Sequence, residues 1–172
     1  GVSVDTWIGD VDENGILQAP AYNHSINSGG IEYIGENALK SLYREKATID
    51  VANFSSVKEI KHSGMRDIFY DCKSITSIIL SGLESIGDYG LYSAFYGCTS
   101  VTSIIFGSLT TIGEYGLYNA FYGCKKLTDV DLSSIKNIGK YGLYYAFYQS
   151  EVTSINLRSL TSASSFLKYL NF

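Results

Sequence analysis

The chain has 172 residues, enough for one domain with a sizeable core, and its composition is 45% hydrophobic and 17% charged with a single proline. This balance excludes an ordinary disordered segment, which is rich in charge and poor in aromatic residues. A net charge of −4, with 13 scattered basic residues, gives no electrostatic basis for nucleic-acid binding. No apolar run approaches the roughly 20 residues of a membrane-spanning helix, so no membrane insertion is expected.

Residues 1–30 precede the regular pattern and are predicted to form an N-terminal capping segment. They contain two extended runs around a turn at Glu13–Gly15, followed by a polar linker. The letters of residues 10–15, DVDENG, match the beginning of a calcium-binding loop, but the position of its closing glutamate is Ala21. Because a β-turn explains the same letters, no metal site is expected. The chain starts without an initiator methionine, so any signal peptide or anchor is expected to lie outside this sequence, and localisation is not read from it directly.

From residue 31 onward the sequence repeats with a period of about 26 residues, as the even spacing of Cys72, Cys98 and Cys124 shows. Such a period is typical of solenoids, in which each unit buries its apolar face against its neighbours. We therefore predict a solenoid of four to five coils over residues 31–160, followed by a C-terminal cap or truncated repeat over residues 161–172. The repeated positions include the column Ile34, Ile60, Ile86, Ile112 and Ile138 and the column Phe69, Phe95, Phe121 and Phe147.

The first half of each unit is predicted to be a strand. In residues 75–80, Ile78 and Leu80 alternate with Ser77 and Ile79, which is the period of a strand with one buried face. A link then leads to a second short extended piece that ends at an Ile–Gly pair. The corresponding strands of the other units are residues 101–106, 127–132 and 152–157.

The second half of each unit, such as residues 88–98 (DYGLYSAFYGC), is predicted to be a short helix. Leu91, Ala94, Phe95 and Cys98 stand at i, i+3, i+4 and i+7, which is one face of an amphipathic helix. Gly97 stands where such a helix should end. The chain is therefore assigned to the α/β class.

Two stretches carry a family resemblance: LTDVDLSSIKNIGKYGLYYAF (127–147) and VTSIIFGSLTTIGEYGLYNAFYGCKKL (101–127). They resemble the BspA-like leucine-rich repeats of bacterial surface proteins, in which Leu-Thr-x-Ile-x-Leu, Ile-Gly and Ala-Phe-x-x-Cys follow one another. The resemblance implies a right-handed β/α superhelix with its strands on one face. It also implies a bacterial protein that is exported to the cell surface or the extracellular space, and it implies adhesion as a function.

The cysteines are predicted to be core residues and not catalytic or metal-binding residues. A thiolate nucleophile needs a nearby histidine and structural zinc needs four ligands, yet the chain has only His24 and His62, and neither follows the repeat of the cysteines. Each cysteine also falls on the buried face of its predicted helix, where a free thiol packs as a small hydrophobe. We therefore expect no catalytic residues, no enzyme activity and no cofactor.

Two surfaces remain as candidate binding sites. One is the outward face of the predicted strands, because solenoids commonly bind partners along such a sheet. The other is a stripe of tyrosines on the predicted helices, which either packs between neighbouring units or binds a partner. The strand-face candidates are Ser77, Ile79, Ser103, Ile105, Asp129, Asp131, Ser154 and Asn156. The aromatic candidates are Tyr89, Tyr92, Tyr96, Tyr115, Tyr118, Tyr122, Tyr141, Tyr144 and Tyr148.

These observations predict a non-enzymatic protein-interaction module at the bacterial cell surface, with an extracellular host protein as its partner. A glycan-binding surface module is one alternative. The other is a structural spacer that presents another module outside this chain. A repeat architecture alone does not choose among them, because fold does not fix function.

Overall fold

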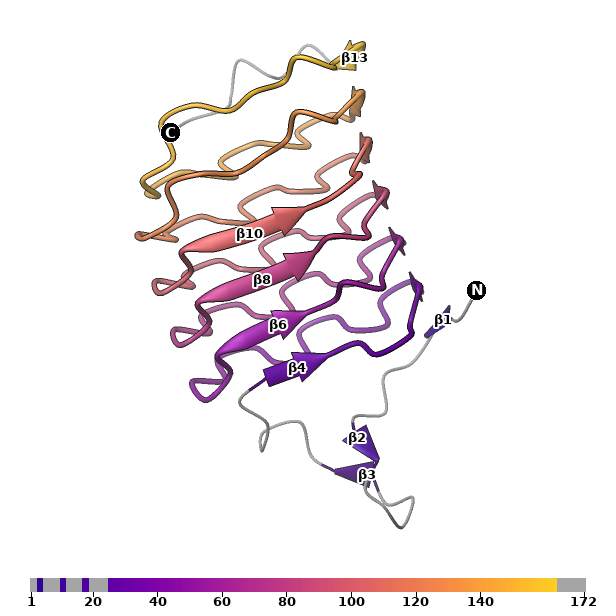
Figure 1. Ribbon diagram of the computed structural model, residues 1–172, viewed down its shortest axis with the longest axis vertical. Coiled ribbons are helices and arrows are strands. Elements are labelled where there is room, and N and C mark those ends of the chain that lie inside the picture. Colours follow the sequence, from indigo (N-terminus) through magenta and orange to yellow (C-terminus); the bar gives the residue numbers. More distant parts are fainter. Residues whose placement is uncertain (1–2, 5–9, 12–16, 19–24, 164–172) are drawn as a thin grey trace.

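The structure, a computed structural model, describes residues 3–4, 10–11, 17–18 and 25–163. Successive coils of the chain stack along one axis, with the same segments of each coil lying above one another (Figure 1). Within the described residues, the coils consist of short strands and turns and contain no helix. The fold is therefore a parallel β-solenoid with a spacing of about 26 residues between equivalent positions.

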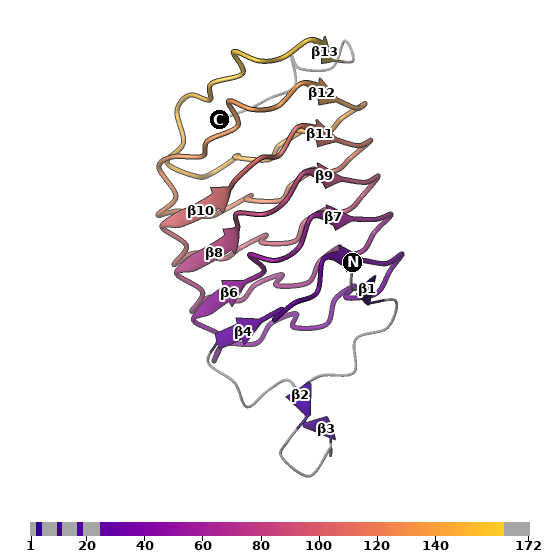
Figure 2. The same ribbon diagram turned by 45° about the vertical axis from the view of Figure 1, so that its right-hand side comes forward.

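Two parallel sheets run along the solenoid (Figure 2). The four-stranded sheet has the order β10-β8-β6-β4, and the seven-stranded sheet has the order β1-β5-β7-β9-β11-β12-β13. The strands of the first are β4 (Ser25–Asn27), β6 (Val51–Asn53), β8 (Ser77–Leu80) and β10 (Ser103–Phe106). Those of the second are β1 (Ser3–Val4), β5 (Tyr33–Ile34), β7 (Glu59–Ile60), β9 (Ser85–Ile86), β11 (Thr111–Ile112), β12 (Asn137–Ile138) and β13 (Ser162–Ala163).

The predicted strands are confirmed in the middle of the chain. β8 and β10 lie within residues 75–80 and 101–106, and Ile78 pairs with Ile104 in the register that the repeat predicts. The second extended piece is confirmed as β9 and its equivalents in the seven-stranded sheet. In the N-terminal segment, β2 (Asp10–Val11) and β3 (Leu17–Gln18) pair antiparallel, and the turn predicted between them lies outside the described residues.

The prediction of strands at residues 127–132 and 152–157 is wrong, because the structure has no strand in either range. Val130 and Leu132 still point into the core, but Asp129 and Asp131 replace the Ser and Ile of β10. Aspartate is depleted in strands because its side chain competes for nearby backbone N–H groups. Asp131 also accepts a hydrogen bond from the Ser133 N–H at 2.9 Å. The four-stranded sheet ends at β10.

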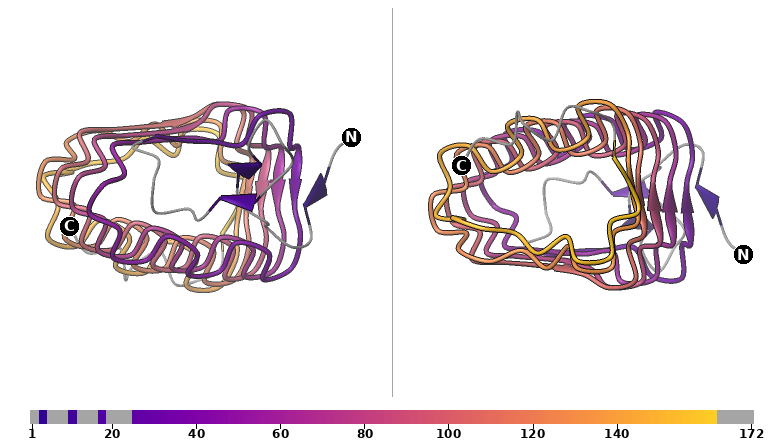
Figure 3. Two further views of the ribbon diagram at one scale, coloured as in Figure 1. Left: turned by 90° about the horizontal axis from the view of Figure 1, so that it is seen from below. Right: turned by 90° about the horizontal axis from the view of Figure 1, so that it is seen from above.

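The predicted helices are also wrong, so the α/β assignment is not confirmed. Residues 88–98 and their equivalents form a series of tight turns, which we call a turn ribbon, and five such ribbons stack opposite the four-stranded sheet (Figure 3). Every fourth residue of a ribbon has a positive φ, as Tyr89 (57°), Ser93 (49°) and Gly97 (70°) show. An α-helix contains no such residues, because the left-handed conformation would break it.

Backbone hydrogen bonding explains why a ribbon forms in place of a helix. The Leu91 and Phe95 N–H groups donate to Gly116 and Ala120 of the next coil, both at 2.9 Å, while alternate N–H groups bond three residues back within their own coil. A helix would satisfy its N–H groups within its own segment. The ribbon instead uses half of its N–H groups to join neighbouring coils, so it exists only as part of the stack.

The core lies between the turn ribbons and the four-stranded sheet. The predicted inward face is confirmed, because Leu91, Ala94, Phe95 and Cys98 are fully buried. The phenylalanine column forms a continuous ladder of stacked rings that begins at Tyr43, with centroid distances of 5.4 to 5.7 Å. The members of this ladder are Tyr43, Phe69, Phe95, Phe121 and Phe147.

Candidate binding surfaces

The aromatic candidates lie on the outer side of the turn ribbons, where all nine tyrosines are half-buried. They form three columns along the solenoid because equivalent residues of successive coils stack directly. Within a column the rings are nearly parallel where the stacking is tightest, as between Tyr92 and Tyr118, which are 4.9 Å apart with an interplanar angle of 2°. The columns are Tyr89, Tyr115 and Tyr141; Tyr92, Tyr118 and Tyr144; and Tyr70, Tyr96, Tyr122 and Tyr148.

An arginine or histidine side chain contacts the first tyrosine ring at the N-terminal end of each column. The Arg44 guanidinium lies 3.9 Å from the Tyr70 ring centroid, and that of Arg66 lies 4.6 Å from Tyr92. His62 meets Tyr89 edge to face at 5.7 Å. Cation–π attraction holds the two guanidinium groups on the exposed face of the first ring. This feature was not predicted, although Arg44 and Arg66 stand one repeat before Tyr70 and Tyr92 in the sequence.

Two of these columns enclose a depression on the surface. Its volume is about 200 Å³, and it is lined by Tyr115, Tyr118, Tyr141 and Tyr144. Burial raises the pKa of the Tyr115 and Tyr118 hydroxyls, and a hydrogen bond with Tyr145 raises the pKa of Tyr144 to about 12. The Tyr115, Tyr118 and Tyr144 hydroxyls therefore keep their protons at neutral pH.

The strand-face candidates point away from the core, as predicted. Ser77 and Ser103 pair in register, and so do Ile79 and Ile105 further along the same face. Ile105 is 47% exposed and is the one exposed large hydrophobic residue within the described residues, while Ile79 is half-buried. Asp129, Asp131, Ser154 and Asn156 lie at the equivalent positions of the two following coils, on the surface.

The position of Ile79 and Ile105 has a different residue in the other coils. Asn27, Asn53, Asp131 and Asn156 occupy it there, and each side-chain oxygen accepts a hydrogen bond from the backbone N–H two residues on, at 2.8 to 3.0 Å. This is the Asx-turn, which stabilises the bend after the strand. The two central coils have an isoleucine at this position instead, of which Ile105 is exposed and Ile79 is half-buried. The exception is visible in the sequence when equivalent positions of the repeats are compared.

At the acidic end of this face, Asp131 is held in its ionised form. Hydrogen bonds from the Ser133 side chain and backbone lower the pKa of Asp131 below its usual value. The face therefore passes from the apolar pair Ile79 and Ile105 to the carboxylates of Asp129 and Asp131 in the next coil.

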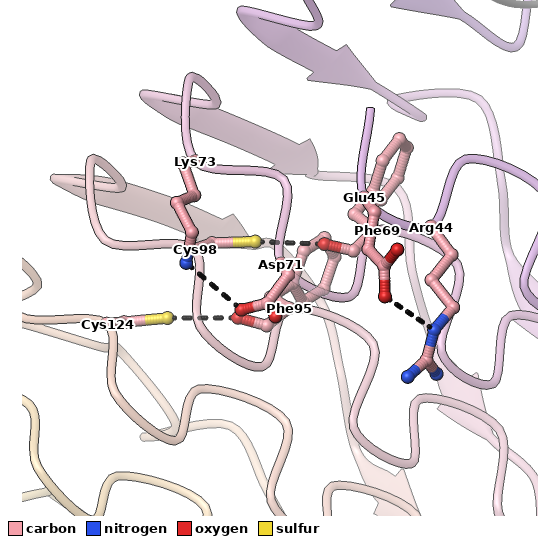
Figure 4. A network of polar contacts seen from close by, with 8 residues as sticks. All are labelled: Arg44, Glu45, Phe69, Asp71, Lys73, Phe95, Cys98 and Cys124. Carbon is pink, nitrogen blue, oxygen red and sulfur yellow. Dashed lines mark hydrogen bonds and ion pairs between the residues drawn. The ribbon is translucent and has the colours of Figure 1, made fainter. Parts of the chain in front are cut away.

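The cysteines are buried in the core, as predicted. The thiols of Cys98 and Cys124 donate hydrogen bonds to the Phe69 and Phe95 carbonyls of the preceding coil, at 3.1 and 3.2 Å (Figure 4). Cys72 does the same to the Tyr43 carbonyl at 2.9 Å. Ser150 takes the cysteine position in the last ribbon but bonds within its own coil, to Phe147 at 2.6 Å. The cysteines therefore connect neighbouring coils.

Within the described part of the chain, no three His, Cys, Asp or Glu side chains gather into a group that could bind a metal ion. His24 and most of residues 10–15 lie outside the described residues. His62 contacts the tyrosine column and lies away from the buried thiols, which it would have to approach in a thiolate site. The residues that the structure describes contain no helix that could cross a bilayer.

Stacked parallel coils of one repeated unit define a repeat protein of the solenoid class, a fold typical of protein-interaction modules and not of enzymes. The family model of the BspA-type leucine-rich repeat region matches in 6 copies over residues 22–92 and 65–168, and the chain belongs to this family. A search of the curated proteins finds no match.

Among solved structures, a leucine-rich repeat protein from Eubacterium ventriosum is similar, with 20% sequence identity and a TM-score of 0.47. The match covers 76% of this chain and 31% of that protein, so this chain spans less than a third of that protein's length.

Proposed function

We propose that the chain is a non-enzymatic extracellular or cell-surface module that binds a host protein through the outward face of its four-stranded sheet. The observation that carries this proposal is the isoleucine pair Ile79–Ile105, which replaces a stabilising Asx-turn in the two central coils. A fold that gives up a local hydrogen bond to expose an apolar side chain favours a binding role for that position. Exposed apolar residues of this kind anchor protein interfaces.

The chemistry of this face supports a protein partner with an apolar anchor beside basic residues. The anchor would cover Ile79 and Ile105, and the basic residues would meet Asp129 and Asp131. Complementary charge of this kind steers encounter and fixes the register of two proteins. Localisation at the cell surface is supported by the resemblance to bacterial surface repeats.

The tyrosine columns give less support to a glycan partner than the sheet face gives to a protein partner. A sugar ring stacks on the open face of an aromatic ring, but the tyrosine faces within each column are covered by their neighbours at 4.7 to 5.2 Å. The outer surface of a column offers ring edges and hydroxyl groups instead.

A binding screen of the chain against extracellular-matrix proteins and glycans tests the proposal. The variant Ile79→Asn/Ile105→Asn should keep the fold, because asparagine forms the Asx-turn at the same position in other coils, and should lose protein binding. Gln149→Asn, a change on a turn ribbon away from this face, is the matched control and should bind as the unaltered chain does. Binding to glycans alone would favour the glycan alternative, and no binding to either class would favour the spacer.

A further inference from the structure

The tyrosine columns bring oxidisable rings of neighbouring coils into contact, and one pair of rings differs from the others in its surroundings. We propose that Tyr96 and Tyr122 are a site of oxidative cross-linking, at which a dityrosine bond joins two neighbouring coils covalently. The oxidant that this modification requires is hydrogen peroxide activated by a haem peroxidase. The site is independent of the sheet face and of any partner bound there.

Tyr96 and Tyr122 are held face to face at equivalent positions of consecutive coils. Their ring centroids lie 4.7 Å apart with an interplanar angle of 14°, near the lower limit of about 4.5 Å for aromatic pairs. The Gly97 N–H donates to the Tyr122 carbonyl at 2.8 Å, which holds the two backbones side by side. Both side chains are half-buried, so the rings contact each other while their outer edges meet water. Radicals formed on the two rings therefore meet without any rearrangement of the chain.

Cations distinguish this pair from the other tyrosine pairs that join consecutive coils. A positive charge over the face of a ring is attracted by the ring electrons and therefore disfavours the loss of one of them. Neither Tyr96 nor Tyr122 has a cation over its ring, and the remaining pairs without one in the described part of the chain are longer, at 5.1 and 5.2 Å. The rings that do contact an arginine or lysine are Tyr70, Tyr89, Tyr92 and Tyr141.

The side chains that oxidants normally attack first are protected. These are cysteine thiolates and the methionine thioether. The three cysteines, Cys72, Cys98 and Cys124, and the one methionine, Met65, are fully buried. Burial also raises the pKa of the three thiols, so they are not thiolates at neutral pH. The half-buried tyrosines are therefore the most readily oxidised side chains at the surface of the described residues, and Trp7 lies outside those residues.

The reaction is a two-electron oxidation of the pair. Each phenol loses one electron and one proton, which leaves a phenoxyl radical on Tyr96 and another on Tyr122. The radicals join through a carbon–carbon bond between the ring positions next to the hydroxyls. The hydrogens on those two carbons then move to the oxygens, which restores both phenols. The two electrons and two protons that were lost reduce one hydrogen peroxide to two waters at the peroxidase.

Treatment of the chain with hydrogen peroxide and a haem peroxidase, followed by cleavage after glutamate and mass spectrometry, tests the proposal. Glu114 lies between the two tyrosines, which therefore fall in residues 85–114 and 115–151. We expect these two fragments to be joined, with the mass of two hydrogens lost, in a product that migrates as a single chain in denaturing electrophoresis. Fragmentation of the joined peptides should place the bond at Tyr96 and Tyr122.

Two variants test the choice of this pair. Tyr96→Phe keeps the ring stack and removes the phenol, so the oxidised variant should lose most of the joined fragments. Tyr92→Phe is the matched control, because Tyr92 stacks on Tyr118 at 4.9 Å in the same ribbon but is covered by Arg66, and it should keep the yield of joined fragments.

The cross-linked chain should also unfold at a higher urea concentration than the untreated chain. The bond closes a loop of about 26 residues and restricts the unfolded chain, as a disulfide does. The urea midpoint of the Tyr96→Phe variant should not rise after the same treatment, because no such loop is closed.

Three results would overturn the proposal: no dityrosine in the oxidised chain, bonds that form mainly between separate chains, or an equal loss of joined fragments in the two Phe variants. The Ile79→Asn/Ile105→Asn variant should cross-link normally, so a failure of this site and a failure of the sheet-face function give different results.

Discussion

Phe121 is the residue whose loss should damage the fold most, because it lies in the middle of the buried ring ladder. Its ring stacks on Phe95 at 5.4 Å and on Phe147 at 5.7 Å, and Phe106 of the opposite sheet meets it edge-on at 6.3 Å. Phe121→Ala removes these contacts and leaves a cavity that the stacked coils cannot close. We expect a loss of about 3–5 kcal/mol in the free energy of unfolding, measured by urea denaturation.

The neighbouring Tyr122→Ala is the appropriate comparison for Phe121→Ala. Tyr122 also stacks between coils, on Tyr96 at 4.7 Å, but it is half-buried and its outer edge meets water. Its removal leaves an open gap and not a closed cavity, so the loss should be clearly smaller. Equal losses for the two variants would show that the tyrosine columns form part of the core, and a binding role for them would be weakened.

The buried thiols should make stability depend on pH on the alkaline side. Burial raises the pKa of Cys72 from 9.0 to about 11, and it raises the pKa of Cys98 and Cys124 as well. Because the unfolded chain releases these protons first, this contribution to stability is complete below pH 9 and is lost as the pH rises through the folded pKa values. Urea midpoints measured from neutral pH upward should therefore fall from about pH 9.

The control for the thiol prediction separates the contribution of the cysteines to the pH dependence of stability from that of the tyrosines. Several tyrosine pKa values are also raised, but from 10.0, so tyrosines contribute at higher pH. A variant in which Cys72, Cys98 and Cys124 are replaced by alanine should have a flatter dependence between pH 9 and 10. An unchanged slope in that range would contradict the assignment of the effect to the thiols.

At the scale of single elements, the turn ribbon shows where sequence reasoning fails. The apolar positions Leu91, Ala94, Phe95 and Cys98 fit a four-residue repeat of turns as well as they fit a helix of 3.6 residues per turn. Over so short a segment the two periods bury the same residues, so the inward face could be predicted while the conformation could not. The conformation is determined by backbone hydrogen bonds to the next coil, and these bonds are not evident from the sequence of one segment.

The two glycines at the end of the ribbons, predicted as helix stops, are required for a different reason. Gly97 and Gly123 both have a positive φ, 70° and 72°, and an alanine there costs about 1–2 kcal/mol. A Cβ on Gly123 would lie 3.8 Å from its nearest neighbour, whereas one on Gly97 would collide with the Asp71 carboxylate. Gly97→Ala should therefore destabilise the chain more than Gly123→Ala, as measured by urea denaturation. Equal losses would mean that Asp71 moves aside freely.

For the whole molecule, the repeat made the solenoid architecture predictable but not the α/β class, because a constant spacing fixes which residues lie above one another and not their conformation. The register of the columns, the buried cysteines and the outward strand face all follow from that spacing. The chain could not be divided correctly into strands near residues 127–132, because Asp129 and Asp131 weaken pairing without changing the apolar pattern. The Asx-turn column and the basic ends of the tyrosine columns depend on comparing coils side by side.

Stacking in register also predicts how the chain should respond to the loss of one coil. Removal of residues 94–119 joins Ser93 to Ala120, which takes the place of Ala94, so every column continues across the junction. The shortened chain should fold, with a lower free energy of unfolding and a smaller dependence on urea concentration, because a solenoid is stabilised by contacts between neighbouring coils. Removal of residues 94–118 leaves one extra residue at the junction and shifts Phe121 out of its column. That variant should lose the cooperative unfolding transition, since inward and outward residues exchange places in the ribbon. If both deletions unfold alike, the columns do not determine the stability of the stack.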